Sequence, residues 1–419
     1  MLTRQLSLML LLSALSLTSA HAASPLFGEA APASRDAAVG QPLMAALQAD
    51  PSVQSMRFVA VNTQALASAE GTLLLNLDST LQLPVELRAS YPINPGYQVW
   101  SGAINVLAGS PEAAQSVDGN TALFVVNGDR VYGQITVEGI SFEVMTVEEG
   151  GHYVLVQRDY SQLPAGDDTP LLSNPYLDYH AVSRSLAPQP EMTTIIRVLQ
   201  IVSEEATSQA GGVLGATDRA IFFLAQANDV YQGNGLDITL QNAAVRFGGS
   251  QGTNDAGRLM SQLTNPGNRR IGAFAATERD NLAADLVGYI SASGLYIRSG
   301  GNLFGLCGIA NAISATEAQG FFIVNVTCTN FTFVHEIGHL FGARHDNDPN
   351  TTPFAFGHGF VNSGGNFRTV MAVNSNPQPR IGLFSTDDQT FNGGSLGNSS
   401  FADNERVHQQ RAATVAGFR

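Results

Sequence analysis

The sequence contains no lysine and only two cysteines. Because all 21 basic residues are arginine, a lysine nucleophile or Schiff base is excluded. Two cysteines cannot build a disulfide-rich scaffold, and no GxSxG segment is present that would place a catalytic serine on a sharp turn. No basic tract indicates nucleic-acid binding. Beyond the N-terminus no apolar run is long enough to cross a bilayer, so no membrane span is expected.

The N-terminus has the pattern of a secretory signal peptide. Arg4 supplies a positive start, residues 6–17 form an apolar run, and Ala-His-Ala at 20–22 offers small residues for cleavage. The competing interpretation is a membrane anchor, but the run covers about twelve residues where a span needs roughly twenty. We therefore expect residues 1–22 to be removed and the mature protein to be secreted.

Size and charge divide the remaining chain into two parts. A chain of 419 residues with 44% hydrophobic residues can bury large cores, and its length predicts two or three folded units. Residues 23–192 carry a net charge of -12, whereas residues 193–419 carry only -3. The acidity therefore belongs to the first part.

Residues 23–192 are expected to form a β-rich acidic domain. Short apolar runs such as MRFVAVN and YQVWSGAINV have strand character, and turn signals at 127–129 and 137–139 predict hairpins. One helix is expected around residues 42–49. The proline- and serine-rich stretch at about 160–192 is interpreted as a linker that proteases can reach.

Residues 193–419 alternate between strand and helix patterns. Strands are expected in TTIIRVLQIVS, LDITLQNAAVRF, ADLVGYISA and FGLCGIANAIS, and helices in TNDAGRLMSQLTN and in TDRAIFFLAQANDVYQGNG, the latter capped by Thr217 or Asp218. Such alternation is typical of a mixed α/β domain. The expected fold class is therefore α/β, preceded by a β-rich domain.

Three of the eight histidines fall within the segment HEIGHLFGARHD. Thr329 or Asn330 could cap a helix from Phe331 to Phe341, and Gly342 could take the left-handed conformation that ends it. Within a helix, residues four apart lie on one face about a turn apart. The segment therefore predicts a helix that presents several of its polar side chains on one side.

This spacing suits a zinc site. His335 and His339 can reach one ion from the helix, and His345 can return after the turn as a third ligand, leaving a fourth position open for water. Glu336 projects beside the ion, where it can hold a water molecule. A bare HExxH occurs by chance in long chains, and its histidines can be ordinary polar residues of a helix. The longer pattern H-E-x-x-H-x-x-G-x-x-H constrains five positions and favours a zinc site.

HEIGHLFGARH resembles the elongated zinc motif of the metzincin metallopeptidases. Met371 in RTVMAV, 26 residues after His345, resembles their Met-turn, and Asp346 directly after His345 resembles the reprolysin (adamalysin) branch. The resemblance covers about residues 193–419, whereas residues 23–190 resemble only loosely the propeptide that precedes such domains. It implies a metzincin catalytic domain with a mixed twisted sheet, a zinc helix and a Met-turn.

The resemblance also assigns roles to residues. It implies zinc ligation by His335, His339 and His345, with Glu336 as general base and Met371 as a hydrophobic floor beneath the metal. The implied reaction is peptide-bond hydrolysis by a water that zinc activates and Glu336 deprotonates. The expected partners are protein or peptide substrates. The alternative is a secreted binding protein that keeps the fold without catalysis.

Further residues are given structural roles by the same resemblance. Asp346 is expected to be a buried carboxylate that ties the motif to the rest of the domain. The strand that includes Gly308, Ile309 and Ala310 is expected to be an edge strand to which an extended substrate adds. Gly342 is expected to end the zinc helix.

The two cysteines are expected to form one disulfide. In an exported chain, pairing of Cys307 with Cys328 is the default, and it would brace the edge strand against the zinc helix. Cys328 as a zinc ligand is the alternative, but a fourth protein ligand would close the site. His358, which lies between two glycines, is expected at the surface.

The acidic first part has two interpretations. As a propeptide it would cover the cleft, inhibit the enzyme and be removed near the linker; as a permanent domain it would bind substrate or a surface. Residues 23–192 contain no cysteine, so a thiolate cannot hold the zymogen inactive. We therefore expect the zymogen to be kept inactive by steric cover of the cleft or by a carboxylate such as Asp159 or Asp178 that approaches the metal.

Calcium binding is possible, but the candidate acidic residues do not have the spacing of a calcium-binding loop. These residues are Asp346, Asp348, Asp387, Asp388 and Asp403.

Overall fold

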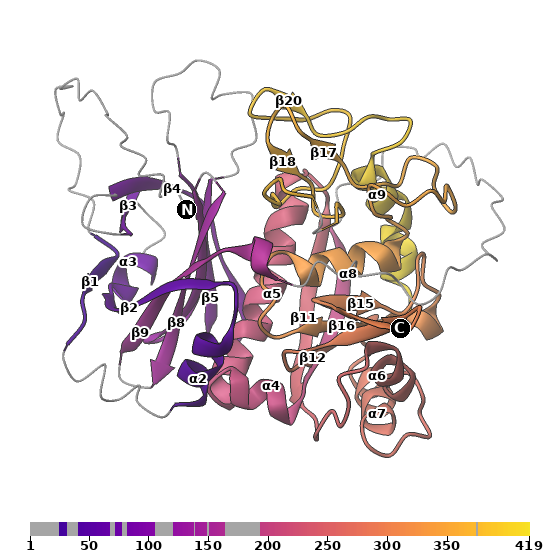
Figure 1. Cartoon of the computed structure of the whole chain (residues 1–419), viewed down its shortest axis with the longest axis horizontal. Helices are drawn as coiled ribbons and strands as arrows, with labels where there is room; N and C mark the ends of the chain where they lie inside the picture. Colours follow the sequence, from indigo (N-terminus) through magenta and orange to yellow (C-terminus); the bar gives the residue numbers. More distant parts are fainter. Residues whose placement is uncertain are drawn as a thin grey trace.

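Two large β-sheets lie on either side of a long helix, α5 (Val213–Gly233) (Figure 1). The computed structural model describes residues 25–31, 41–67, 72–77, 82–104, 120–137, 139–148, 151–163, 193–373 and 376–419. The expected signal peptide at 1–22, Asp178 and most of the expected linker lie outside these residues. Among the described helices, none combines the length and the apolar character that crossing a membrane requires.

The first part of the chain forms a nine-stranded antiparallel sheet, in the order β1-β2-β9-β8-β7-β6-β5-β4-β3. The turn expected at 127–129 joins β6 to β7, and β7 pairs antiparallel with β8 from Val137 and Ile140, on either side of the second expected turn. Its strands are β1 (Phe27–Glu29), β2 (Val53–Val61), β3 (Thr72–Asn76), β4 (Gln82–Asn94), β5 (Tyr97–Ile104), β6 (Thr121–Asn127), β7 (Arg130–Val137), β8 (Ile140–Glu148) and β9 (His152–Arg158). The β-rich character expected of this part is therefore present, together with the helix at α2 (Pro42–Ala49).

The central strands of this sheet are apolar on both faces because both faces are buried. Trp100 and Phe124 belong to a core on one face, where α3 (Thr63–Ala67) contributes Leu66. Successive side chains of a strand point to opposite faces, and the alternate residues, such as Leu123, join the core that contains α5. The sheet thus uses one face for its own core and the other for the second part of the chain.

The second sheet has five strands in the order β11-β10-β12-β16-β15. Four are parallel, and β15 pairs antiparallel with β16 at the edge. The strands are β10 (Thr194–Val202), β11 (Ile238–Phe247), β12 (Leu286–Ser291), β15 (Gly308–Ala310) and β16 (Phe321–Asn325). The mixed α/β class expected for this part is confirmed.

Helices cover both faces of the second sheet. On one face, α5 and α8 (Thr332–Phe341) pack into the central core. On the other, α6 (Ala256–Leu263) and α7 (Gly272–Asn281) contribute to a separate core (Figure 1). The last helix, α9 (Asn404–Val415), packs against α8. The remaining regular elements are short: α4 (Glu204–Gln209), β13 (Tyr296–Ser299), β14 (Asn302–Gly305), β17 (Val361–Asn362), β18 (Phe367–Arg368), β19 (Thr390–Phe391) and β20 (Gly394–Ser395).

The start of α5 was predicted incorrectly from the sequence. The helix begins at Val213 after Gly212, so Thr217 and Asp218 lie inside its second turn and do not cap it. Asp218 instead accepts hydrogen bonds from the hydroxyl of Tyr97 and the guanidinium of Arg130 in the first sheet. A polar residue that looked like a helix start is therefore an interface residue.

The two parts of the chain meet in a largely buried interface along α5. Gln226 donates from Nε2 to Gln134 Oε1 at 2.7 Å and to the carbonyl oxygen of Thr329 at 2.9 Å. Nearby, the side chain of Thr329 bonds to the fully buried carboxylate of Glu143 in β8. Thr329 lies just before α8, so the first sheet is bonded to the segment that leads into that helix.

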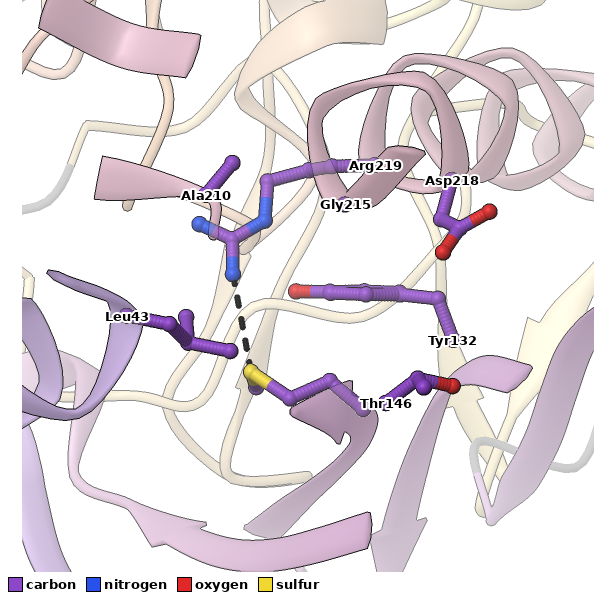
Figure 2. A pocket seen from close by; sticks show the side chains of 8 residues that line it. Leu43, Tyr132, Thr146, Ala210, Gly215, Asp218 and Arg219 are labelled. Atoms are coloured by element: carbon purple, nitrogen blue, oxygen red, sulfur yellow. Dashed lines mark hydrogen bonds between the residues drawn. The ribbon is translucent and has the colours of Figure 1, made fainter. Parts of the chain in front are cut away.

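A pocket opens at one end of this interface (Figure 2). Arg219 of α5 lies over the ring of Tyr132, 5.1 Å from its centroid, and its Nη2 donates to the sulfur of Met145 at 3.7 Å. Leu43 of α2 also lines the pocket. None of its lining residues belongs to the histidine segment, so we assign it to the packing of the two parts rather than to chemistry.

Asp218→Ala should destabilise the full chain by about 3 kcal/mol, because it leaves the Arg130 guanidinium and the Tyr97 hydroxyl buried without their carboxylate. Urea unfolding followed by the fluorescence of the single tryptophan, Trp100, measures the change. The exposed Asp237, changed to alanine, is the control. Equal stability of the two variants would contradict the importance of this contact.

Glu405 near the start of α9 should make the fold less stable as pH rises. Burial, helped by the charges of Asp388 and Asp403, raises the pKa of Glu405 from 4.5 to about 7. Between these two values the unfolded chain releases a proton that the folded chain retains, so the free energy of unfolding falls through this range. Glu405→Gln should remove this fall, which denaturation at pH 4.5 and 7.5 measures. An unchanged pH dependence in the variant would contradict it.

Candidate metal centre

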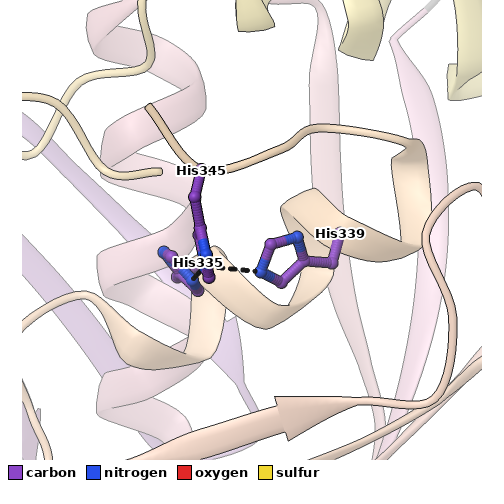
Figure 3. Close-up of side chains that lie close together, drawn as sticks. All are labelled: His335, His339 and His345. Atoms are coloured by element: carbon purple, nitrogen blue, oxygen red, sulfur yellow. Dashed lines mark hydrogen bonds between the residues drawn. The ribbon is translucent and has the colours of Figure 1, made fainter. Parts of the chain in front are cut away.

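The histidine segment forms the helix α8 and the turn that follows it. His335 and His339 project from one side of α8, and the chain beyond the helix brings His345 over them (Figure 3). The return is possible because Gly342 adopts a φ of 118°, which ends the helix as expected, and a side chain there would be strained. All three histidines are at most 7% exposed.

The three imidazoles converge through their Nε2 atoms. The Nε2 atom of His345 lies 3.1 Å from that of His335 and 3.1 Å from that of His339. Three nitrogens that bind one ion at 2.0 to 2.1 Å in tetrahedral geometry would stand about 3.3 Å apart. The spacing therefore matches three ligands of a single ion.

The outer contacts of two rings fix which nitrogen carries hydrogen. Nδ1 of His335 lies 2.8 Å from the carbonyl oxygen of Val370, and Nδ1 of His339 lies 2.9 Å from that of Ala343. Because a carbonyl can only accept, both Nδ1 atoms donate, and in a neutral ring Nε2 then holds an unshared pair. Burial and nearby positive groups hold the pKa of His335 and His345 well below the usual value, which favours the neutral form.

These facts together favour a bound cation. If Nε2 of His345 carried a hydrogen, it could donate to Nε2 of His335 or to Nε2 of His339, but not to both. The lone pair of the remaining histidine would then face a nitrogen atom without a hydrogen bond in a buried site. A cation at the centre of the three atoms would accept all three pairs. A set of three imidazole nitrogens suits a transition-metal ion. The expected ligand residues thus lie where one metal ion could be held.

Glu336 is fully buried beside the first histidine and faces the edge strand β15. A Cβ atom on Gly308 would lie only 2.6 Å from Oε1 of Glu336 and 2.9 Å from the carbonyl oxygen of Ile323. The missing side chain at Gly308 therefore gives the carboxylate its space. The expected edge strand, Gly308 to Ala310, does lie at the edge of the five-stranded sheet.

Met371 is buried beneath the helix. A Cβ on Gly338 would lie 2.5 Å from the sulfur of Met371, so glycine at 338 lets the thioether approach α8 closely. Val370, the residue before Met371, supplies the carbonyl that orients His335. The close packing of Met371 against α8 thus has a local cause, and its role as a floor beneath the metal stays a prediction.

Asp346 ties the histidine turn to the segment after Met371. Its Oδ1 accepts from the backbone N–H of Val373 at 2.9 Å, and its Oδ2 accepts from the side chain of Asn376 at 3.2 Å. The expectation of a buried carboxylate is wrong, because Asp346 is only partly buried. Each oxygen of the carboxylate accepts one of these hydrogen bonds, and the side chain keeps part of its contact with water.

The disulfide between Cys307 and Cys328 is present. It joins the residue before β15 to the loop that leads into α8, and Leu163 and Tyr160 of the first part pack on it. The cap expected for α8 was wrong: Phe331 precedes the helix with a φ of 61°, and Thr329 is used by the interface with the first sheet. The side chain of Thr329, which was expected to cap the helix, bonds to Glu143 in the first sheet instead.

His358 is also placed differently from the expectation of a surface residue. It is fully buried, its Nε2 lies 2.9 Å from the carbonyl oxygen of Asn350, and its ring stacks on Phe401 at 4.2 Å. It therefore acts as a packed, hydrogen-bonded core residue. Glycines on both sides suggested exposure, but they allow close packing instead, since a Cβ on Gly359 would meet the backbone of Met371 and Ala372.

The structure places a buried arginine near the site that sequence reasoning did not identify. Arg380 donates from Nη1 to the carbonyl oxygen of Asn330 and from Nη2 to that of Ala372, at 3.0 and 2.9 Å. Its positive charge contributes, after burial, to the low pKa of His335 and His345. No spacing rule links Arg380 to the histidines, so the sequence carried no signal for it.

The chain is similar in sequence to known metallopeptidases. Residues 193–385 match the family model described as Metallo-peptidase family M12. A peptidyl-Asp metalloendopeptidase of Stenotrophomonas maltophilia (strain R551-3) is 30% identical over 97% of this chain and 96% of that protein. The chain belongs to metallopeptidase family M12. The peptidyl-Asp metalloendopeptidase of Xanthomonas campestris pv. campestris is likewise 30% identical, over 96% of this chain and 95% of that protein.

As a member of family M12, the protein is a metalloendopeptidase, as its resemblance to the metzincins implied. Among solved structures, metalloproteinase-II from Bacteroides fragilis aligns with 68% of this chain and 84% of that chain, with a TM-score of 0.40 and 11% identity. The relatives match nearly the whole chain, so the similarity extends beyond the histidine segment.

Gly308→Ala should lower kcat/KM on the order of 100-fold, because the new methyl group displaces the Glu336 carboxylate. Peptide hydrolysis measures the loss, and metal content should stay near that of the unaltered protein because the histidines are not touched. Gly249→Ala is the matched control, since a Cβ there meets nothing within 4 Å. Equal activity of the two variants would show that Glu336 does not depend on this space.

Proposed function

We propose that the protein is a secreted zinc endopeptidase that is made as a zymogen. The observation that carries the zinc assignment is the convergence of the Nε2 atoms of His335, His339 and His345 in a buried site. Three neutral imidazoles leave one tetrahedral position for water or substrate, which is the arrangement of catalytic rather than structural zinc. Secretion rests on the signal-peptide pattern at residues 1–22.

When bound, zinc would supply Lewis acidity, which lowers the pKa of water and polarises the carbonyl of the scissile bond. The side chains and backbone of the protein would orient the metal ligands and transfer the proton. Val370 and Ala343 orient two of the imidazoles through their carbonyls. The buried Glu336 carboxylate would take a proton from the attacking water and then pass it to the leaving amine. No covalent acyl-enzyme is needed.

The substrate would lie along the edge strand β15. An extended peptide can add to a sheet edge through backbone hydrogen bonds, and Gly308 at the start of β15 lies against Glu336. Pairing along this edge would bring the peptide backbone to the carboxylate. The relatives in Stenotrophomonas and Xanthomonas are named peptidyl-Asp metalloendopeptidases. We extend that preference to this protein: it would cleave next to an acidic residue.

The first part of the chain would serve as the propeptide. Its sheet is bonded to α5 and to Thr329, just before the zinc helix, and Leu163 packs on the disulfide next to β15. These contacts support a domain that reaches the border of the cleft, so its removal would change access to the site. Asp159 accepts from Ser161 in a local turn, which favours steric cover over this carboxylate as the source of latency. A permanent domain is the alternative.

Glu336→Ala should lower proteolysis on the order of 1,000-fold or more, because the general base is lost. Casein cleavage by the secreted protein, before and after metal removal and zinc replacement, measures the effect, with mass spectrometry of the fragments. The exposed Glu204→Ala is the control. The active form should be a fragment that begins near residues 185–193.

Three outcomes separate the parts of this proposal. Cleavage that survives in Glu336→Ala would contradict the role of the glutamate. Full activity of the uncleaved chain would contradict the propeptide and leave the peptidase in place. Activity that zinc does not restore, while another metal does, would contradict the zinc assignment alone.

A further inference from the structure

The disulfide between Cys307 and Cys328 joins the edge strand to the segment that leads into α8. Cys307 directly precedes Gly308, the first residue of β15, where a side chain would clash with Glu336. On the other side of the bond, α8 begins four residues after Cys328, at Thr332. The disulfide therefore holds the strand that gives Glu336 its space next to the start of the helix that carries Glu336.

Residues of the first part cover this bond. The two cysteines are at most 1% exposed, and Leu163 joins them in a small apolar cluster on which Tyr160 packs. This cluster is separate from the cores that contain α5 and α6. Within the described part of the chain, both apolar side chains that the cluster adds to the cysteines belong to the first part.

Hydrogen bonds hold this cover in place. The hydroxyl of Tyr160 donates to Oε1 of Glu143 at 2.9 Å and lies 3.0 Å from the hydroxyl oxygen of Thr329. Gln134 donates from Nε2 to the same tyrosine hydroxyl at 2.6 Å. The backbone N–H of Leu163 donates to the carbonyl oxygen of Tyr160 at 3.1 Å, so one turn fixes both side chains over the disulfide.

We infer that the disulfide is a redox switch that the first part shields in the zymogen and that becomes accessible when the first part is removed. The inference rests on the proposed function, because removal of the first part belongs to it. Exchange with a thiol requires a thiolate to reach one of the two sulfurs, so its rate depends on access. Loss of Tyr160 and Leu163 takes away the apolar side chains that cover the bond.

The switch needs a thiol reductant as its partner. The thiolate of a dithiol attacks one sulfur, which forms a mixed disulfide and releases the other cysteine as a thiolate. The second thiol of the reductant then attacks the mixed disulfide, and the reductant leaves as a cyclic disulfide. Two electrons and two protons pass from the reductant to the protein, so Cys307 and Cys328 each end as a thiol.

Reduction should lower the activity of the processed protein. The pairing of β15 with β16 would remain, but β15 would no longer be tied to the loop before α8. A small shift between these segments would bring Gly308 and Glu336 out of their close fit. A displacement of about 1 Å lowers enzyme rates on the order of 100-fold. Full activity would then be restricted to surroundings poor in thiols, in agreement with the proposed secretion.

The first experiment measures how fast the disulfide is reduced in the folded protein. The uncut chain and the processed protein are treated with dithiothreitol without denaturant, and samples are quenched over time with iodoacetamide. Because the chain has only two cysteines, the mass of the alkylated protein gives the fraction reduced. The processed protein should react at least about tenfold faster than the uncut chain.

Two variants of the uncut chain test the cover itself. L163A should speed reduction at least about threefold, because it opens the cluster over the sulfurs while the first part stays in place. L73A is the matched control, since Leu73 of β3 is 5% exposed against 7% for Leu163 but belongs to the other core of the first sheet. L73A should react at the rate of the unaltered chain.

The second experiment measures peptide hydrolysis. Processed protein that is reduced, alkylated, freed of reagents and supplied with zinc should lose at least about tenfold in kcat/KM. The uncut chain receives the same treatment for the same time and is processed only afterwards; it should keep its activity. Because the reagents are the same in both cases, this comparison separates reduction from loss of metal to the reductant.

Equal rates of reduction in the uncut and processed forms would overturn the inference, and so would equal acceleration in L163A and L73A. Full kcat/KM after complete reduction of the processed protein would also overturn it. Where L163A does not fold, the comparison of the uncut and processed forms decides. Mass spectrometry follows reduction without any proteolysis, whereas absence of any cleavage that requires Glu336 would reject the proposed function.

Discussion

The convergence of three neutral imidazoles on one point is the constraint on which the rest of the site depends. The Nε2 atoms of His335 and His339 each lie 3.1 Å from Nε2 of His345. The Nδ1 atoms of His335 and His339 donate hydrogen bonds to backbone carbonyls. Without a cation, this arrangement holds unshared electron pairs against one another among buried side chains. The fold must therefore supply enough packing energy to keep the rings together, and a metal ion would then repay that cost.

Glycine makes this packing possible at the points where the segments approach most closely. Gly342 reverses the chain so that His345 can return, Gly338 admits the sulfur of Met371, and Gly308 admits the carboxylate of Glu336. Glycine avoids backbone strain at Gly342 and a side-chain clash at Gly338 and Gly308. The site is therefore compact because α8, its C-terminal cap and the edge strand β15 have glycine at these three positions.

Features that depend on residues close together in the chain could be predicted from the sequence. The predictions were wrong where contacts between distant segments determine the role of a residue. The helix α8, its end at Gly342 and the ligand spacing all follow from a twelve-residue segment. Thr329 and Asp218 looked like helix caps, but both are used by the first sheet, through Glu143 and Arg130. A capping side chain stabilises a helix by about 1 kcal/mol. A buried hydrogen bond to a charged partner contributes more, so the side chain bonds to that partner instead.

Arg380 shows the same limit at the site itself. It reaches Asn330 and Ala372, which lie 50 and 8 residues away, and neither bond has a sequence pattern. The positions of both acceptors depend on the packing of α8 against the segment after Met371, which in turn depends on Gly338 and Gly359. A sequence motif can therefore identify the three histidines and the glutamate, because they share one helix and one turn. The contacts of Arg380 join segments that only the folded chain brings together, so no motif could identify them.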